Sequence, residues 1–136
     1  MSAGERFFDT NVLLYLLSGN AAKADRAEEL ISGGGVISVQ VLNEFAAVAS
    51  RKLGMAWPEI REILAQLRAV CHIVPLDLET HESGLHLAER WRLPFYDALI
   101  VASALRGGCK VLYSEDFQDG QSFEKQLTIR NPFREA

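Results

Sequence analysis

Apolar positions along the chain fall into short compact runs separated by longer stretches with helical spacing. The compact runs, at 6–9, 36–38, 71–76, 110–114 and 127–133, have the length of strands. Helical spacing is predicted over 11–17, 21–32, 39–53, a segment starting near Trp57-Pro58, 77–91 and 95–106. Strands that alternate with helices imply parallel crossovers. We therefore expect an α/β protein, a three-layer α/β/α sandwich around a short, mainly parallel sheet.

Length and composition set further bounds. The 136 residues, of which 49% are hydrophobic and 24% charged, fit a single globular domain spanning 1–136. The longest apolar runs are far shorter than the ~20 residues that cross a bilayer, and no leader-like segment opens the chain. We expect a cytoplasmic protein that makes no use of a membrane. Cys71 and Cys109 lie in apolar runs and are expected to be buried, reduced thiols.

The net charge of −4 argues against a general polycationic grip on nucleic acid. It does not exclude a local basic rim. No G-K-[ST] follows the glycine-rich "SGGGVIS", so a phosphate-binding loop is disfavoured. His81 and His86 are five positions apart, which is unlike a zinc-protease helix, and no serine occupies a G-x-S-x-G turn.

Four acidic residues occupy positions where an acid is unusual. Asp9 stands at the end of the first predicted strand, just past "RFF", and Asp116 just past "KVLYS", where parallel sheets bind their ligands. Glu44 shares a helical face with apolar residues, and Asp97 heads the apolar stripe of a nearly all-apolar helix. Each acid alone could be a cap, a turn residue or the margin of a solvated face.

Such local roles explain a single acid more easily than they explain four acids that come together at one site. Carboxylates crowded in a partly buried pocket repel one another and take up protons unless a cation neutralises them. A set of oxygen ligands selects a hard ion, which predicts Mg²⁺ or Mn²⁺.

The segments around these acids resemble the PIN-domain family. They are "FFDTNVLLYLL" with Asp9, "ISVQVLNEF" with Glu44, "LPFYDALIVASAL" with Asp97 and "LYSEDFQDG" with Asp116. More narrowly, the chain is similar to the VapC-type ribonuclease toxins of bacterial toxin–antitoxin pairs. The similar segments occur in the family's order over nearly the whole chain.

Membership would imply a metal-dependent endoribonuclease that cleaves RNA phosphodiester bonds with a metal-activated water. The resemblance makes Asp9, Glu44 and Asp97 the catalytic, metal-binding acids and Asp116 the fourth. Asp119 competes with Asp116 for that place. Asn11 and Ser114 match polar positions that support the metal shell or its water, although capping would explain them equally well.

The same resemblance implies partners. A VapC-type toxin would bind an RNA substrate and a small antitoxin that blocks the site, often with a basic side chain, and it would form a homodimer. The third and fourth predicted helices offer apolar residues that are either core or walls of a partner groove. These residues are Leu42, Phe45, Leu53 and Trp57.

Three other functions compete with a toxin. One is a stand-alone PIN nuclease in RNA processing. Another is an acid-nucleophile phosphatase, in which Asp9 would attack phosphate, although that class places a second Asp where this chain has Asn11. The third is a catalytically silent interaction module. The sequence leaves open the RNA target, whether DNA is cut, and whether one or two metals bind.

Overall fold

The computed structural model describes residues 1–134, and within them one sheet of six strands runs through the molecule. The spatial order is β3 (Cys71–Val74), β2 (Gly35–Ser38), β1 (Arg6–Phe8), β4 (Val111–Tyr113), β6 (Leu127–Arg130) and β5 (Ser122–Phe123). All neighbouring pairs are parallel except β5 with β6. The strand order reverses direction between β1 and β4, so the two carboxyl ends at that point are the expected place for a ligand.

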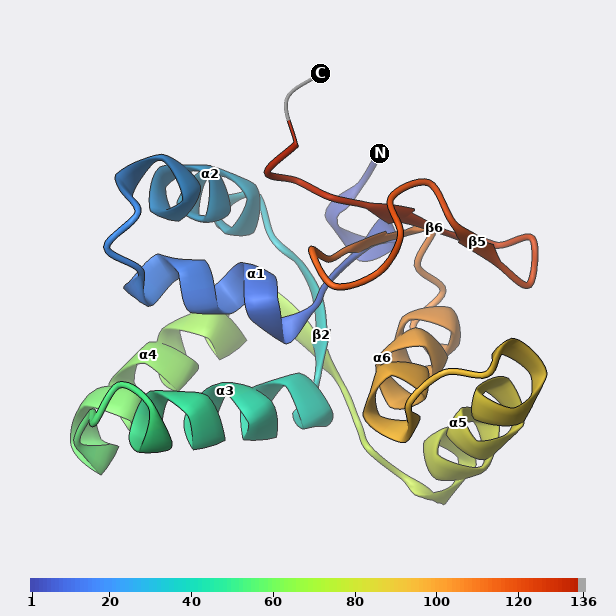
Figure 1. Ribbon diagram of the computed structural model, residues 1–136. Coiled ribbons are helices and arrows are strands. Elements are labelled where there is room, and N and C mark those ends of the chain that lie inside the picture. The colour runs from blue at the N-terminus through green and yellow to red at the C-terminus, as the bar shows by residue number, and fades with distance from the viewer. Residues whose placement is uncertain (135–136) are drawn as a thin grey trace.

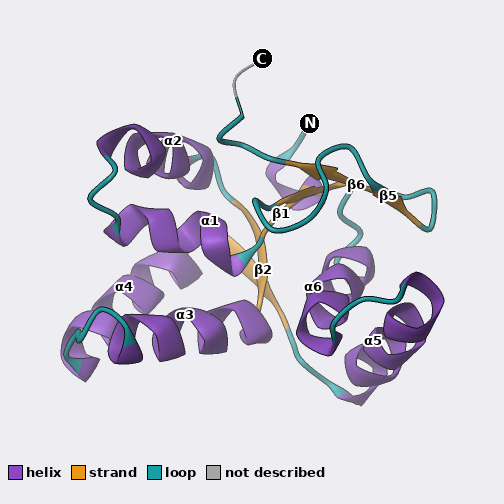
Figure 2. Cartoon of the chain, in the orientation of Figure 1, coloured by secondary structure: helices purple, strands orange, loops and turns teal. Residues whose placement is uncertain are grey.

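Helices cover both faces of this sheet. α1 (Thr10–Leu14) continues into a 3₁₀ turn, η2 (Tyr15–Leu17), and groups with α2 (Ala21–Ser32), α3 (Val39–Arg51) and α4 (Trp57–Val70) on one side in Figure 1. α5 (Leu78–Trp91) and α6 (Phe95–Arg106) lie on the other side, and η1 (Ala3–Glu5) precedes β1. Figure 2 shows β1 and β2 between these two groups. The predicted three-layer α/β/α sandwich is confirmed.

Two local expectations were wrong in detail. The first strand ends at Phe8 rather than at Asp9, because the Asp9 carboxylate caps α1 by accepting from the backbone N–H of Thr10. β5 was not predicted at all. It is only two residues long and pairs back onto β6 through a turn in which Glu124 and Lys125 both have positive φ, 52° and 56°.

The core fills the space between the sheet and both helical layers. Phe7 and Phe8 of β1, Ile37 of β2, Leu112 of β4 and Ile129 of β6 are fully buried. α6 is the most deeply enclosed helix, with every residue from 98 to 104 buried, as its nearly all-apolar sequence predicted. It packs closely on α5, where a Cβ on Gly84 would come within 2.7 Å of the Leu99 side chain.

Cys71 and Cys109 are buried free thiols, as predicted. Burial raises the pKa of each thiol to about 11, so both stay protonated at neutral pH. Within residues 1–134, every helix is too short or too polar to cross a lipid bilayer.

Two fully buried serines should respond in opposite ways to the same substitution. Ser38 caps α3 by accepting from the N–H of Val41, whereas the Ser103 hydroxyl in α6 is buried without a hydrogen-bond partner among the described residues. We expect Ser38→Ala to lower the free energy of unfolding by about 1 kcal/mol, because a helix cap is lost. Ser103→Ala should raise it by a similar ~1 kcal/mol, because an unsatisfied polar group is removed. Urea unfolding of both variants measures the two signs, and a destabilised Ser103→Ala would contradict this account.

Candidate functional site

Asp9 stands at the point where the strand order reverses. The parallel register pairs Phe8 with Tyr113, so Asp9 and Ser114, the next residues along β1 and β4, lie side by side. The Asp9 carboxylate accepts from the Ser114 hydroxyl at 2.7 Å, the Thr10 N–H at 2.7 Å and the Asn11 amide at 3.2 Å. Only 6% of Asp9 is exposed. Two residues that follow Asp9 in sequence and one that follows the neighbouring strand therefore give this buried carboxylate three donors.

Those donors do not compensate for burial. Burial raises the pKa of Asp9 to about 7, the hydrogen bonds from Ser114 and Thr10 partly oppose this, and the charges of Asp116 and Glu44 raise the pKa further. A carboxyl group that is half protonated near neutral pH is unusual for an aspartate. It marks a place where a positive charge would be favourable.

Glu44 reaches the same region from α3. It is half-buried, and its Oε1 accepts from the Thr10 hydroxyl at 2.9 Å. Burial raises the pKa of Glu44, hydrogen bonds from Thr10 and Gln40 lower it, and the charges of Asp97 and Asp116 raise it again. Glu44 therefore points inward, as its position on the apolar face predicted.

Asp97 comes from the opposite helical layer. It lies in the first turn of α6, whose N-cap, Pro94, makes no side-chain capping bond. Burial raises the pKa of Asp97, and the charge of Asp116 raises it further. α3 and α6 contact each other, and the charge of Asp97 contributes to the raised pKa of Glu44.

The two candidates for the fourth acid, Asp116 and Asp119, differ in their contacts. Asp116 is exposed, yet its charge raises the pKa of Asp9, Glu44 and Asp97 alike. Asp119 instead accepts from the backbone N–H of Asn131 at 2.9 Å and pairs with Arg134 at 3.3 Å, where it ties its loop to the end of β6. The structure brings Asp116 to the other three acids and leaves Asp119 in a local structural contact.

Asn11 and Ser114 connect Asp9 to the loop that carries Asp116 through hydrogen bonds. The Asn11 amide donates to both Asp9 and the Ser114 hydroxyl at 3.2 Å, while its carbonyl oxygen accepts from the Glu115 N–H at 3.1 Å. The buried Ser114 hydroxyl donates to Asp9 and also accepts from the Asp116 N–H at 3.1 Å. Both side chains hold the acids and their loop in place.

Sequence reasoning missed Thr10 and Gln40. Both contact Glu44, and neither carries a signal of its own, because their importance comes from the packing of α1 against α3. The "DTN" triplet is the only hint. Each of its three side chains takes part in the hydrogen-bonded network around the acids.

Comparison with known proteins decides the family. The family model described as PIN domain matches residues 6–119, which contain all four acids. The chain belongs to the PIN domain family. No curated protein matches the sequence significantly.

Two solved structures share the PIN fold with this chain. A toxin–antitoxin complex from Klebsiella pneumoniae aligns with a TM-score of 0.70 at 21% identity, over 94% of this chain and 98% of that one. VapC20 of Mycobacterium tuberculosis, described as a toxin that cleaves the sarcin–ricin loop, aligns with a TM-score of 0.67 at 21% identity, over 82% of this chain and 89% of that one.

The donor chemistry of this PIN domain fits a hard divalent cation. All four side chains offer only carboxylate oxygens, and their mutual repulsion is relieved by a positive charge. Within residues 1–134, no three Asp, Glu, His or Cys side chains are gathered closely enough to form a ready-made metal site. The four acids are therefore near enough to interact electrostatically but are not drawn together as ligands.

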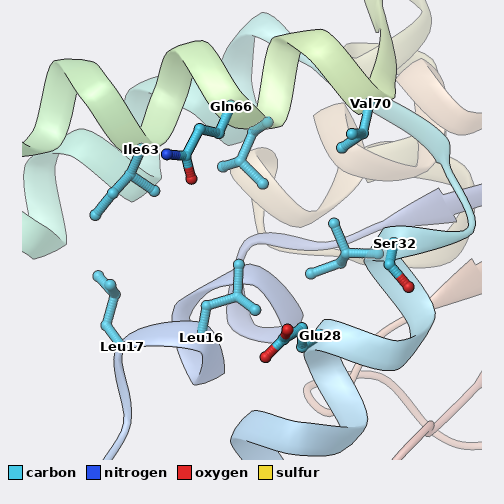
Figure 3. A pocket seen from close by; sticks show the side chains of 9 residues that line it. Leu16, Leu17, Glu28, Ser32, Ile63, Gln66 and Val70 are labelled. Atoms are coloured by element: carbon cyan, nitrogen blue, oxygen red, sulfur yellow. The ribbon is translucent and has the colours of Figure 1, made fainter.

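Two apolar hollows lie on either side of η2. One, of about 420 Å³, is a groove between η2, α2 and α4, and Figure 3 shows Leu16, Leu17, Ile63 and Val70 around it with Glu28 on the side of α2. The other, of about 470 Å³, includes Asn11 in its lining and so adjoins the acids. We call the first the η2–α4 groove. Its complete lining is Leu16, Leu17, Glu28, Ile31, Ser32, Ile63, Gln66, Leu67 and Val70.

The four residues that the sequence predicted as either core or walls of a partner groove lie in different environments. Phe45 is fully buried core, and Leu42 packs partly buried against that core. Leu53 is 48% exposed and lines the second hollow. Trp57, 60% exposed, lines neither hollow. The η2–α4 groove therefore contains none of these four residues.

The stability of the metal-free PIN domain should fall as pH rises from about 4 to 7. In this window the unfolded chain releases the Asp9 proton near its ordinary pKa of 3.8, whereas the folded chain holds it until about pH 7. The coupled acids share the resulting penalty, which we expect to be on the order of 2 kcal/mol. Asp9→Asn keeps an amide oxygen for the Thr10 N–H and should remove most of this pH dependence. Thermal unfolding in a chelator at pH 5 and pH 8 measures it.

Asp25→Asn is the matched control for this experiment. Asp25 is exposed on α2, so the same substitution there should leave the pH dependence of stability as in the unmodified chain. An Asp9→Asn variant that loses as much stability between pH 5 and pH 8 as the unmodified chain would show that Asp9 is not protonated in the fold.

Proposed function

We propose that this PIN domain is a Mg²⁺- or Mn²⁺-dependent endoribonuclease and acts as the toxin of a VapBC-type toxin–antitoxin pair. The observation that carries the nuclease proposal is the set of four mutually repelling carboxylates, from four separate segments, at the sheet's switch point. Such a set is costly for the fold and fits an oxygen-ligated cation. Membership of the PIN family supports the same assignment.

Asp9, Glu44, Asp97 and Asp116 would hold the cation. When bound, the cation would neutralise negative charge on the phosphodiester and lower the pKa of the water bound to it. The chain's own part is to orient the ligands. Ser114 and Asn11 fix the Asp9 carboxylate, and Thr10 fixes that of Glu44. Asp116, the exposed acid, is the one placed to orient the attacking water by a hydrogen bond.

A phosphatase that uses Asp9 as nucleophile is disfavoured by the geometry. One Asp9 oxygen accepts from the Thr10 N–H, and the other accepts from both Ser114 and Asn11. A nucleophilic carboxylate needs an oxygen free to attack phosphorus. A trapped aspartyl-phosphate would support the phosphatase and contradict the nuclease.

A silent interaction module is the competing proposal from another class. The presence of all four acids in an electrostatically unfavourable arrangement favours a catalytic role over a lost one, since neutral residues would stabilise the fold. RNA cleavage assayed with and without Mn²⁺ separates the two proposals.

The toxin proposal draws support from the structural neighbours. One is a chain from a toxin–antitoxin complex that aligns over 98% of its length, and the other is described as a toxin that cleaves the sarcin–ricin loop. We propose an RNA substrate and a small antitoxin partner for this chain on that basis, with a homodimer as a further expectation. A short reading frame directly upstream would support the toxin, and its absence would favour a stand-alone PIN nuclease in RNA processing.

The η2–α4 groove suits such a partner. Its walls are mainly aliphatic, and Glu28 adds a negative charge in a protein that is already acidic. An amphipathic helix with an apolar face and a basic residue complements that surface. We propose that the antitoxin inserts such a helix there.

Asp97→Asn should abolish divalent-metal-dependent RNA cleavage, with a loss of at least about a hundredfold in kcat, while the fold persists. The substitution removes a ligand charge and relieves repulsion, so the thermal midpoint in chelator should not fall. Glu62→Gln, on the exposed surface of α4, is the control and should cleave normally. An Asp97→Asn protein that cuts as fast as the unmodified chain would remove Asp97 from the site.

Val70→Lys should weaken binding of the upstream-encoded protein by at least about tenfold, because it places a charge in the apolar groove. Leu85→Lys on α5 is a matched control, since both side chains are 47% exposed. Calorimetric titration of each variant measures the effect. Loss of binding in Leu85→Lys with normal binding in Val70→Lys would place the partner on α5 instead.

A further inference from the structure

Glu115 lies between two site residues but faces away from the acids. Ser114 on one side bonds Asp9, and Asp116 on the other interacts with all three remaining acids. The Glu115 carboxylate instead accepts from the Tyr15 hydroxyl at 2.5 Å and the Lys23 ammonium at 2.7 Å. The chain bends at residues 115–117, directly after β4, so that the two neighbouring carboxylates make different contacts.

We propose that Lys23, Tyr15 and Glu115 form a clamp that positions the Asp116 loop against the element that carries Asp9. The three are positioning residues: they touch neither RNA nor cation in this proposal and act through the loop. The effect on metal binding rests on the proposed function, whereas the effect on the loop itself does not.

The clamp is a closed triangle of polar groups. Lys23 donates to the Tyr15 hydroxyl at 3.0 Å as well as to Glu115, and the Tyr15 hydroxyl donates to Glu115. The ion pair is shielded, because Lys23 and Glu115 retain only 33% and 28% of their side-chain exposure. A partly buried, three-way contact of this kind is worth more than an exposed ion pair.

Aromatic packing holds the triangle in place. The Tyr15 ring meets the Phe133 ring edge-on, with centroids 4.6 Å apart. The Lys23 ammonium lies 4.7 Å from the Tyr15 centroid and 5.4 Å from that of Phe133. The lysine is therefore fixed by a carboxylate, a hydroxyl and two ring faces at once.

Tyr15 gives the clamp its connection to the acids. It belongs to η2, which continues directly from α1, the short helix capped by Asp9. The Glu115 backbone N–H also bonds Asn11 in α1 at 3.1 Å. Both the side chain and the main chain of Glu115 are thus tied to the segment that starts at Asp9, and Lys23 adds a tie to α2.

Asp116 depends on these ties because it has few of its own. Its side chain is exposed, and its backbone N–H bonds the Ser114 hydroxyl at 3.1 Å. An exposed carboxylate on a loop is a poor ligand unless neighbouring contacts fix its backbone. The clamp also matches the Glu115 charge with that of Lys23, so that the loop does not bring an uncompensated fifth negative charge to the acids.

Tyr15→Phe and Lys23→Met test the clamp. The first keeps the ring that packs on Phe133 and loses only the hydroxyl, and the second keeps an unbranched apolar chain without the cation. Tyr113→Phe is the matched control: its ring stacks on Phe8, and its hydroxyl has no hydrogen-bond partner among residues 1–134. Lys23→Arg is the conservative variant that should restore the ion pair.

Three readouts are measured on each full-length variant. They are hydrogen exchange of the amides of residues 115–118, Mn²⁺ affinity by calorimetric titration, and kcat and KM for RNA cleavage. In Tyr15→Phe and Lys23→Met we expect faster loop exchange, a three- to tenfold weaker Mn²⁺ affinity and a similar loss in kcat with KM unchanged. Tyr113→Phe should match the unmodified chain, and Lys23→Arg should recover most of the loss.

The outcomes separate this inference from the proposed function. Loop exchange and Mn²⁺ affinity that both stay normal in Tyr15→Phe and Lys23→Met would overturn the clamp. Faster exchange with unchanged Mn²⁺ affinity would also overturn it, since the contact would then be structural only. If the unmodified chain binds no Mn²⁺, the metal-dependent nuclease is wrong, and loop exchange alone still decides whether the three residues hold the loop.

Discussion

The central constraint in this molecule is the presence of an aspartate almost fully buried among other acids. Asp9 is tolerated because a neighbouring strand, its own helix and an adjacent amide supply three donors to its carboxylate. Even so, burial and the charges of Asp116 and Glu44 raise its pKa to about 7, so the three donors do not offset the loss of solvent around the carboxylate. The other acids of the site lie around this one unfavourable charge.

Parallel strands make this arrangement possible. β1 and β4 end in register, so that Asp9 and Ser114 meet without any long side chain having to reach across the sheet. The helices on the two faces then bring Glu44 and Asp97 to the same edge from opposite layers. Glu44 and Asp97 lie on helices and Asp9 caps one, whereas Asp116 comes from a loop. A side chain on a loop depends more on neighbouring contacts for its position.

Much of the fold and of the acid set could be predicted from the sequence, because the signals are local. Alternating apolar runs gave the strands and helices, and an inward-facing Glu44 followed from its helical neighbours alone. What could not be predicted depends on contacts between distant segments. The contacts of Asp119 with Asn131 and Arg134, at the end of β6, are one example. The two-residue β5 has no periodicity to detect.

The acids and the η2–α4 groove are built from different residues, although η2 connects the two regions. Evolution can therefore change one while leaving the other intact. A gene copy that exchanged its acids for neutral side chains would gain stability and keep its groove, and if the groove binds the proposed partner, its product would compete for that partner as an inactive decoy.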